Sequence, residues 1–403
     1  MVPFVRLWFE GGWLHIEGAG EHLGLSLRNP HARCYLAPPS DYASLRAAAI
    51  REGVSLDDEV APLLTASSRF LPMPPPDPRL LDLLASVDLH GGSGYLALPE
   101  GKPRIAIASL LASSARTPVL LLCPEDRDTS RWRMALSSAG ASPEVVSLEQ
   151  AAVGVHSWGH RFGLVLVDRV EKASGELLRR VLRGLVAPQR IGLIAPGSPI
   201  PEEPRALGLV HLCGELQRTH IKGRYLDWIR LFLPLDAREQ GEWDSLACSS
   251  AGPKEEGNDW QRSWSLVVSA RRKRTLLREL ILRYQGQHMG VLVSMPSGVP
   301  LPSWTDLLQD LTVGERGPFL SAIRRGRLWL GAIEDLPTER CRMDVIVLLG
   351  GTGSHPVQVL SSILSRRGIL YDLRAARTHE DPCWRWSAWH VRDDDEQEQA
   401  DDP

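Results

Sequence analysis

The chain has 403 residues, of which 43% are hydrophobic and 24% charged, a composition typical of a globular protein of two or three domains. Its formal net charge is −3, but the acidic residues gather at the C-terminus, so that residues 1–391 carry 45 basic and 42 acidic side chains. No apolar run is long enough to span a bilayer, and the N-terminus lacks the pattern of a signal peptide. We therefore expect a cytoplasmic protein without a membrane partner. The mild basicity of residues 1–391 permits nucleic-acid contact without requiring it.

The first part of the chain predicts a small α+β domain. Residues 3–18 alternate apolar and polar side chains around Gly11-Gly12, which indicates two short strands, and residues 41–53 have the pattern of a helix. The stretch FLPMPPPDPRL that follows contains five prolines within nine residues. Because proline resists helix and strand alike, we expect a linker there.

Short apolar runs then alternate with helical segments. The runs are YLALP, PVLLLCP, EVVSL, FGLVLVD and RIGLIAP. Nearly continuous apolar strands joined by helices indicate a parallel sheet that is covered on both faces. A polar stretch over residues 235–261 is expected to be a loop, after which the alternation resumes with MGVLVSM, GRLWLGA, DVIVLLGG and GILYDLR. The sequence therefore predicts two α/β sheets in tandem.

The order of several motifs resembles that of the XPB-like branch of superfamily 2 DNA helicases, which are of the DEAD/DEAH type. The matching segments are LPEGKPRIAIA, LLLCPEDRDTSRWRMAL, FGLVLVDRVEKA, APQRIGLIAPGSP, SARRKRTLLREL, GAIEDLP and MDVIVLLGGTGSHPVQVLSSILSR. The resemblance implies two RecA-like domains of the P-loop NTPase type. The expected organisation is a small damage-recognition-like α+β domain at 1–68, a proline-rich linker at 69–84, RecA-like domain 1 at 85–234, a connecting loop at 235–262, RecA-like domain 2 at 263–386 and an acidic disordered tail at 387–403.

The segment that would bind a nucleotide lacks parts of a phosphate-binding loop. Such a loop wraps phosphates with glycine N–H groups and supplies a lysine for the phosphates and a hydroxyl for Mg²⁺. Gly101 and Lys102 remain, but two residues of the family pattern are missing between them, and Pro103 stands at the hydroxyl position. We interpret these three residues, together with Gln358 in the last motif, as a vestigial nucleotide site.

The residues that would catalyse hydrolysis are replaced as well. The resemblance implies two adjacent acidic residues after the strand FGLVLV, one for the Mg²⁺ shell and one to activate water. Here Asp168 remains and Arg169 takes the second place. The segment 195–199 lacks the threonines of the third motif, and Ser362 stands where the last motif has an arginine. We therefore expect no catalytic residue at these positions.

The leading hypothesis is a pseudo-helicase, because the polar residues specific to ATP chemistry are replaced at four separate sites while the apolar strand residues are kept. It would act without a cofactor as a scaffold or accessory subunit in DNA repair or defence, with an active helicase or nuclease as partner. Two alternatives stay open. One is a divergent but active ATP-dependent DNA helicase or translocase, which would use ATP and Mg²⁺, and the other is a DNA-binding module without turnover.

DNA is a further candidate partner. Arg271, Arg272 and Arg274 cluster on one predicted helix, and Arg325 precedes a strand of the second domain. The ordinary role of such a run is a solvated helical face, and phosphate contact without sequence readout is the alternative. The six cysteines are scattered singly, so we predict incidental or buried thiols and no metal site.

Overall fold

A computed structural model of the chain describes residues 4–10, 13–18, 28–29, 34–37, 39–64, 77–115, 117–199, 209, 211–221, 224–249, 258–293, 327–332, 342–350, 363–376 and 378. The chain divides into two compact units, Met1–Cys213 and Gly214–Pro403. Among the described residues, no helix combines the length and the apolarity needed to cross a membrane.

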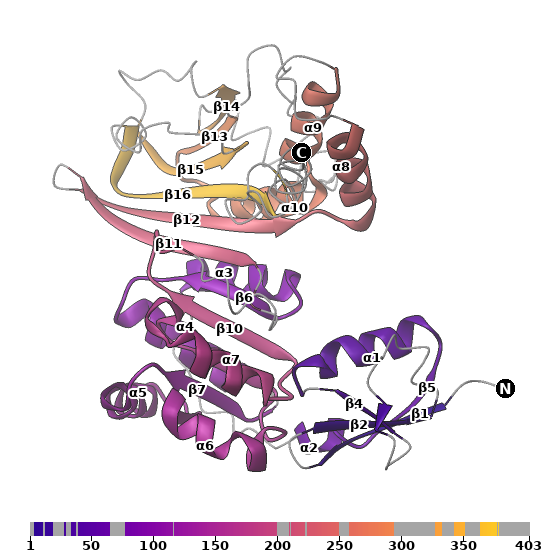
Figure 1. The fold of residues 1–403 in the computed structure, drawn as a ribbon. Helices are drawn as coiled ribbons and strands as arrows, with labels where there is room; N and C mark the ends of the chain where they lie inside the picture. Colours follow the sequence, from indigo (N-terminus) through magenta and orange to yellow (C-terminus); the bar gives the residue numbers. More distant parts are fainter. Residues whose placement is uncertain are drawn as a thin grey trace, which may run out of the picture. The chain divides into compact units, whose positions relative to one another are not determined.

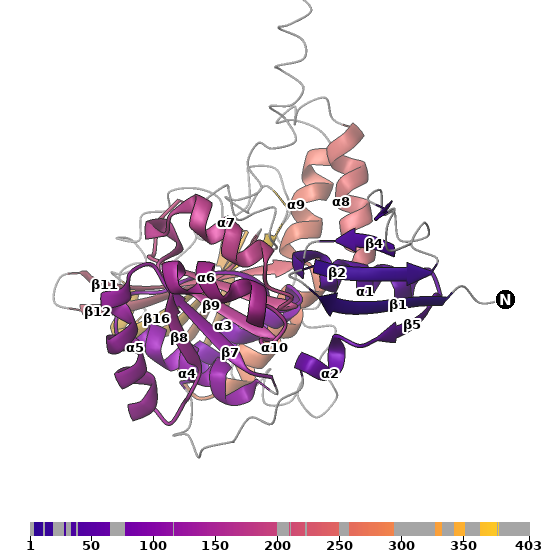
Figure 2. The ribbon, with the colours of Figure 1, turned by 60° about the horizontal axis from the view of Figure 1, so that its bottom comes forward.

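The first unit begins with a small five-stranded sheet (Figures 1 and 2). The predicted hairpin is confirmed, because β1 and β2 pair in antiparallel fashion and Trp8 lies opposite His15. Helix α1 covers one face of this sheet. The elements are β1 (Phe4–Glu10), β2 (Trp13–Gly18), β3 (Arg28–Asn29), β4 (Cys34–Ala37), a 3-10 turn (Pro39–Asp41), α1 (Tyr42–Arg51), β5 (Ser55–Asp58) and α2 (Ala61–Leu64), with strand order β3-β4-β2-β1-β5.

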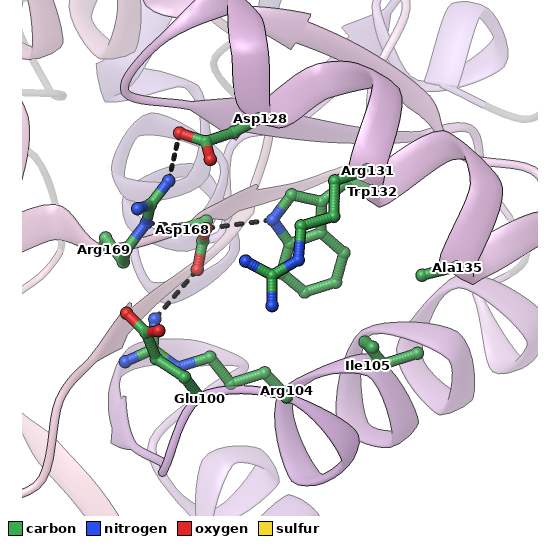
Figure 3. Close-up of a pocket in the computed structure, with 10 residues that line it drawn as sticks. Glu100, Arg104, Ile105, Asp128, Arg131, Trp132, Ala135, Asp168 and Arg169 are labelled. Carbon is green, nitrogen blue, oxygen red and sulfur yellow. Dashed lines mark hydrogen bonds and ion pairs between the residues drawn. The ribbon is translucent and has the colours of Figure 1, made fainter.

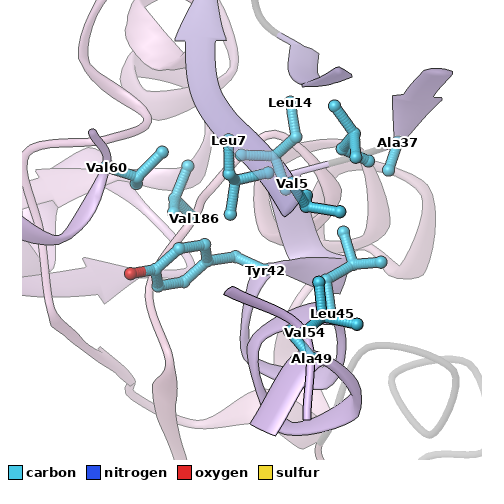
Figure 4. Close-up of a cluster of buried hydrophobic side chains, with 11 residues drawn as sticks. Val5, Leu7, Leu14, Ala37, Tyr42, Leu45, Ala49, Val54, Val60 and Val186 are labelled. Atoms are coloured by element: carbon cyan, nitrogen blue, oxygen red, sulfur yellow. The ribbon is translucent and has the colours of Figure 1, made fainter. Parts of the chain in front are cut away.

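The apolar core of this small domain includes a residue from the α/β part of the same unit. Val5, Leu7 and Leu14 point from the strands toward Tyr42 of α1, and Val186 joins the same buried cluster (Figure 4). Alternate residues of β1 are buried, as the period of a strand with one covered face requires. The sheet therefore has an inner face that packs against α1 and Val186, and an outer face turned away from them.

The rest of the first unit is an α/β layer structure whose five strands are all parallel. The strand order is β6-β10-β9-β7-β8. Because the order reverses after β8, α4 and α5 lie on one face, and α6 and α7 on the other. The elements are α3 (Pro78–Leu89), β6 (Ser93–Ala97), α4 (Lys102–Ser114), β7 (Val119–Cys123), α5 (Asp126–Ser138), β8 (Glu144–Ser147), α6 (Leu148–Trp158), β9 (Leu164–Val167), a 3-10 turn (Val170–Lys172), α7 (Gly175–Arg183) and β10 (Gln189–Ile194).

The second unit contains mostly parallel strands, in the order β14-β13-β15-β16-β12-β11. Its one antiparallel pair among the described strands is the β11–β12 hairpin. The elements are β11 (Leu212–Ile221), β12 (Arg224–Pro234), α8 (Ala237–Ser249), α9 (Asn258–Val268), α10 (Arg271–Arg283), β13 (Met289–Val293), β14 (Leu328–Ala332), β15 (Met343–Leu349) and β16 (Leu364–Ala376). The predicted class, two α/β units after a small α+β domain, is confirmed.

Three predicted boundaries differ from the bounds of the observed elements and units. Helix α3 begins at Pro78, inside the expected 69–84 linker, because the Asp77 carboxylate accepts the Arg79 N–H at 3.0 Å and proline is tolerated in a first helical turn. The expected 235–262 loop holds α8 and the start of α9. The expected end of RecA-like domain 1 at residue 234 is also displaced, since the first unit ends at Cys213 and β12 pairs with β16 of the second. Residues 69–76 and the predicted tail at 387–403 lie outside the described residues.

Candidate functional site

The candidate site lies at the carboxyl ends of β6 and β9, the edge where open parallel sheets bind their ligands. Four residues, 98–101, connect β6 to α4. Gly101 has φ of +92°, which favours glycine, and Lys102 follows as the first, exposed residue of α4. Pro103 lies in the first helical turn, where its missing N–H leaves no helical hydrogen bond unmade. The three residues predicted as a vestigial nucleotide site are thus adjacent at the start of one helix.

Arg104 is the residue that the sequence analysis missed. It lies in the first turn of α4, yet its side chain is only 3% exposed. Its Nε donates to the carbonyl oxygen of Leu98 at 2.9 Å, and its Nη1 donates to Oδ1 of Asp168 at 3.0 Å (Figure 3). The Arg104 guanidinium is therefore bonded to the connection between β6 and α4, the segment that would have to bind a nucleotide's phosphates.

Asp168, directly after β9, accepts hydrogen bonds on both carboxylate oxygens. Arg104 occupies Oδ1, while Oδ2 accepts from Nε1 of Trp132 at 2.9 Å and from Nε of Arg169 at 3.2 Å. Its side chain is 5% exposed. Both oxygens of the acid predicted to remain from the metal-binding motif are therefore engaged by side chains of the chain itself.

Arg169, at the second acidic position of the resembled motif, links Asp168 to Asp128 of α5. Its backbone is left-handed, with φ of +45°, an uncommon conformation for a residue with a side chain. Its guanidinium forms ion pairs with both carboxylates. Burial lowers the pKa of Arg169, but Asp168 and Asp128 together raise it by more, so the net pKa is raised. Two guanidinium groups and two carboxylates thus form a closed set of balanced charge.

A cavity of about 40 Å³ borders this set, which is room for a few water molecules. Glu100, Arg131 and Ile105 line it together with the ion-paired residues (Figure 3). At the end of the adjoining strand β7, burial and then the charges of Asp168 and Asp128 raise the pKa of the Cys123 thiol to about 12. Cys123 is thus a buried thiol, as predicted, and it stays protonated at neutral pH.

These residues do not fit Mg-ATP. A Mg²⁺ ion prefers oxygen ligands, and both nearby carboxylates already face guanidinium groups. The carboxylate of Glu100 lines the same cavity and would repel a phosphate. Within the part of the chain that the structure describes, no three His, Cys, Asp or Glu side chains lie close enough to hold a metal ion.

The predicted nucleic-acid residues lie in the second unit, on α10. Arg271 is exposed, and its backbone N–H donates to Oε1 of Glu239 at 2.7 Å. Nη1 of Arg272 donates to the carbonyl oxygen of Pro234 at 3.1 Å, and Arg274 is half-buried. The charged run is therefore not a uniformly solvated face. Arg325, Gln358 and Ser362 lie outside the described residues.

Neither a protein-family model nor a curated protein matches the chain. Among solved structures it is similar to bacteriophage T4 UvsW, at 12% identity and a TM-score of 0.32 over 94% of this chain and 93% of that chain. The Pyrococcus furiosus Hef helicase domain has 14% identity and a TM-score of 0.29 over 77% and 98%, and the Sulfolobus solfataricus SWI2/SNF2 ATPase core in complex with dsDNA has 12% and 0.28 over 78% and 91%. These neighbours are superfamily 2 helicase cores. At such identities and TM-scores, they assign neither a family nor an activity to the chain.

Proposed function

We propose that the chain is a helicase-like protein that does not hydrolyse ATP and acts as a scaffold or accessory subunit. The observation that carries this proposal is the closed charge set at the carboxyl edge of the first unit's sheet. Arg104, Trp132 and Arg169 hold both oxygens of Asp168, the one acid that remains from the resembled metal-binding motif.

Hydrolysis of a nucleotide needs a metal ion, a group that orients the attacking water, and cations that stabilise the transferred phosphoryl group. For Asp168 to bind a metal, Arg104 and Arg169 would have to leave it, so that the buried guanidinium of Arg104 would lose its carboxylate partner and Arg169 would keep only Asp128. Removing one partner of a buried ion pair costs about 3–5 kcal/mol. Such a cost weighs against nucleotide binding at this edge.

The scaffold role and its partner rest on different support. The resemblance to XPB-like helicases motivates an active helicase or nuclease of a DNA-repair or defence system as the partner, with DNA as a further candidate. On α10, Arg271 is the most accessible of the three arginines proposed to contact phosphate, because Arg272 is bonded to Pro234.

The test is calorimetry of the full chain with Mg-ATP, followed by hydrolysis assays with and without DNA. We expect no saturable binding up to about 1 mM nucleotide, the upper end of ordinary Michaelis constants, and no turnover above background. The variants are K102A and D168N, with circular dichroism to show that each folds. E149Q, which changes an exposed carboxylate on α6, is the matched control.

One result overturns the proposal in favour of an active helicase or translocase. That result is DNA-stimulated turnover that falls in K102A and in D168N while E149Q keeps it. Saturable nucleotide binding without turnover that is lost in D168N would also contradict the closed site, because it requires the Asp168 carboxylate to be available.

A further inference from the structure

The outer face of the N-terminal sheet carries exposed aromatic side chains. Phe4 is 52% exposed and Trp13 is 44% exposed. Between them the Trp8 ring stacks on His15, with ring centroids 5.1 Å apart, and the guanidinium carbon of Arg6 lies 5.6 Å from the Trp8 ring centre. Because side chains alternate along a strand, all of these residues belong to the face opposite α1. We call this surface the aromatic face.

Hydrogen bonds hold the middle of the aromatic face in place. Nε1 of Trp8 donates to the Glu10 carboxylate at 3.2 Å, and Nε2 of His15 lies 3.2 Å from the backbone carbonyl oxygen of Glu10. The Sγ of Cys34, on β4, lies 3.6 Å from Nδ1 of His15. Such a preorganised stack loses little conformational freedom when another group docks on it.

The charge of the aromatic face is strongly one-sided. Among the side chains that the structure describes there, the carboxylates are Glu10, Glu17, Asp57 and Glu59, and the cation is Arg6. Arg6 is itself paired with Glu59 at 2.6 Å. Glu59 raises the pKa of Arg6 most, desolvation lowers it, and the charges of Asp57 and Glu17 raise it further, so that the net pKa is raised. The surface therefore has a surplus of negative charge beside exposed tryptophan.

We propose that the aromatic face binds an extended, arginine-bearing segment of a partner protein. A guanidinium is attracted to the face of a tryptophan ring and to carboxylates, and Arg6 over Trp8 already shows the first of these contacts within the chain. The seven residues of β1 offer a surface about 20 Å long, which suits a short extended peptide. This inference holds whether or not the chain hydrolyses ATP.

The same charges disfavour nucleic acid on this face. The resemblance implied a damage-recognition-like domain, and exposed tryptophans do stack on bases in single-strand binding proteins. Those proteins combine stacking with a positively charged groove along the phosphates, however. Here a phosphodiester backbone would meet four carboxylates and one arginine that is already paired.

The test measures fluorescence anisotropy of a labelled peptide of alternating arginine and serine, titrated with the full chain at low ionic strength. We expect saturable binding that weakens about tenfold in W13A, the effect of losing a desolvated cation–π contact. The double variant E17Q/D57N should bind more weakly and with a flatter salt dependence. The control is the double variant V153A/E149Q, which changes an exposed apolar side chain and an exposed carboxylate on α6.

Two comparison probes decide the outcome, namely a peptide of alternating glutamate and serine and a single-stranded DNA. Absence of binding by the arginine peptide overturns the proposal, and so does equal binding by W13A and the control. DNA binding that is lost in W13A and gained in E17Q/D57N would make the face a nucleic-acid surface instead. If W13A does not fold, E17Q/D57N carries the test, because both of its substitutions are at exposed positions.

Discussion

Carboxylates lie beside arginine and tryptophan at two places in the first unit, where the charges are balanced in one place and in surplus in the other. At the carboxyl edge of its parallel sheet, Asp168 and Asp128 are matched by Arg104 and Arg169, and all four side chains are largely buried. On the aromatic face, the charged side chains that the structure describes are four exposed carboxylates and one cation, Arg6.

The difference follows from what water does for a charge. An unpaired ion in the interior costs several kcal/mol, so a buried cluster must balance its charges within itself. At the surface, water and salt screen the surplus, which can persist at little cost and remains available to another molecule. The closed cluster therefore keeps its charges balanced within itself, with Nη2 of Arg104 left as a buried donor without a partner among the described residues, whereas the open one retains its attraction for a cation.

The largest effect is expected when the closed cluster is broken. D168A leaves the buried Arg104 without its carboxylate partner and Arg169 with Asp128 alone, and we expect it to lower the free energy of unfolding by about 3–5 kcal/mol. Urea denaturation followed by circular dichroism measures this loss. The double variant R104M/D168L, which replaces the Arg104–Asp168 pair by apolar groups of similar size, should recover part of it. A loss in D168A no larger than that in E149Q would show that the cluster is not closed.

The strands of the parallel sheets could be predicted from the sequence. Apolar runs such as YLALP and FGLVLVD became β6 and β9, because strands buried on both faces leave a nearly continuous apolar signal. Two helices were missed although their start signals were present. Asp77 precedes Pro78 at the start of α3, and before α8 the Asp236 and Glu239 side chains form a reciprocal capping box.

The closed cluster was not predictable in the same way. Asp168 and Arg169 were singled out, but their partners Arg104, Trp132 and Asp128 were not. Arg104 lies 64 residues before Asp168 in the chain, and within its own segment it is indistinguishable from a solvated arginine near a helix start. Only the parallel pairing that brings the ends of β6 and β9 to one edge sets the two side chains against each other.

A smaller effect is expected where the inner face of the N-terminal sheet meets the α/β part. The His160 ring packs 5.1 Å from Phe9, and its buried Nδ1 has no hydrogen-bond partner. Burial, and then Arg161, lower the pKa of His160. The unfolded chain therefore binds a proton at a higher pH than the folded chain, and stability should fall as the pH drops below about 6.5.

Urea midpoints at about pH 7 and pH 5 measure this dependence. H160F removes the titrating group and keeps an aromatic ring beside Phe9, so we expect a smaller difference between the two midpoints than in the parent chain. H156F, at an exposed position on α6, should keep the parent's pH dependence. If the two midpoints differ as much in H160F as in the parent chain, His160 is protonated as readily in the folded chain as in the unfolded chain.

The smallest effect on stability is expected on the aromatic face, where an almost unchanged urea midpoint is the informative result. The Arg6–Glu59 pair joins at 2.6 Å, a closer approach than the 3.0 Å of Arg104–Asp168, but its side chains are 46% and 44% exposed. Distance alone would rank the surface pair as the stronger one, whereas solvation ranks it as the weaker. E59Q should therefore leave the urea midpoint unchanged within error under conditions in which D168N lowers it clearly. Equal losses in the two variants would mean that the carboxylates of the aromatic face stabilise the fold and are not held in surplus for a partner.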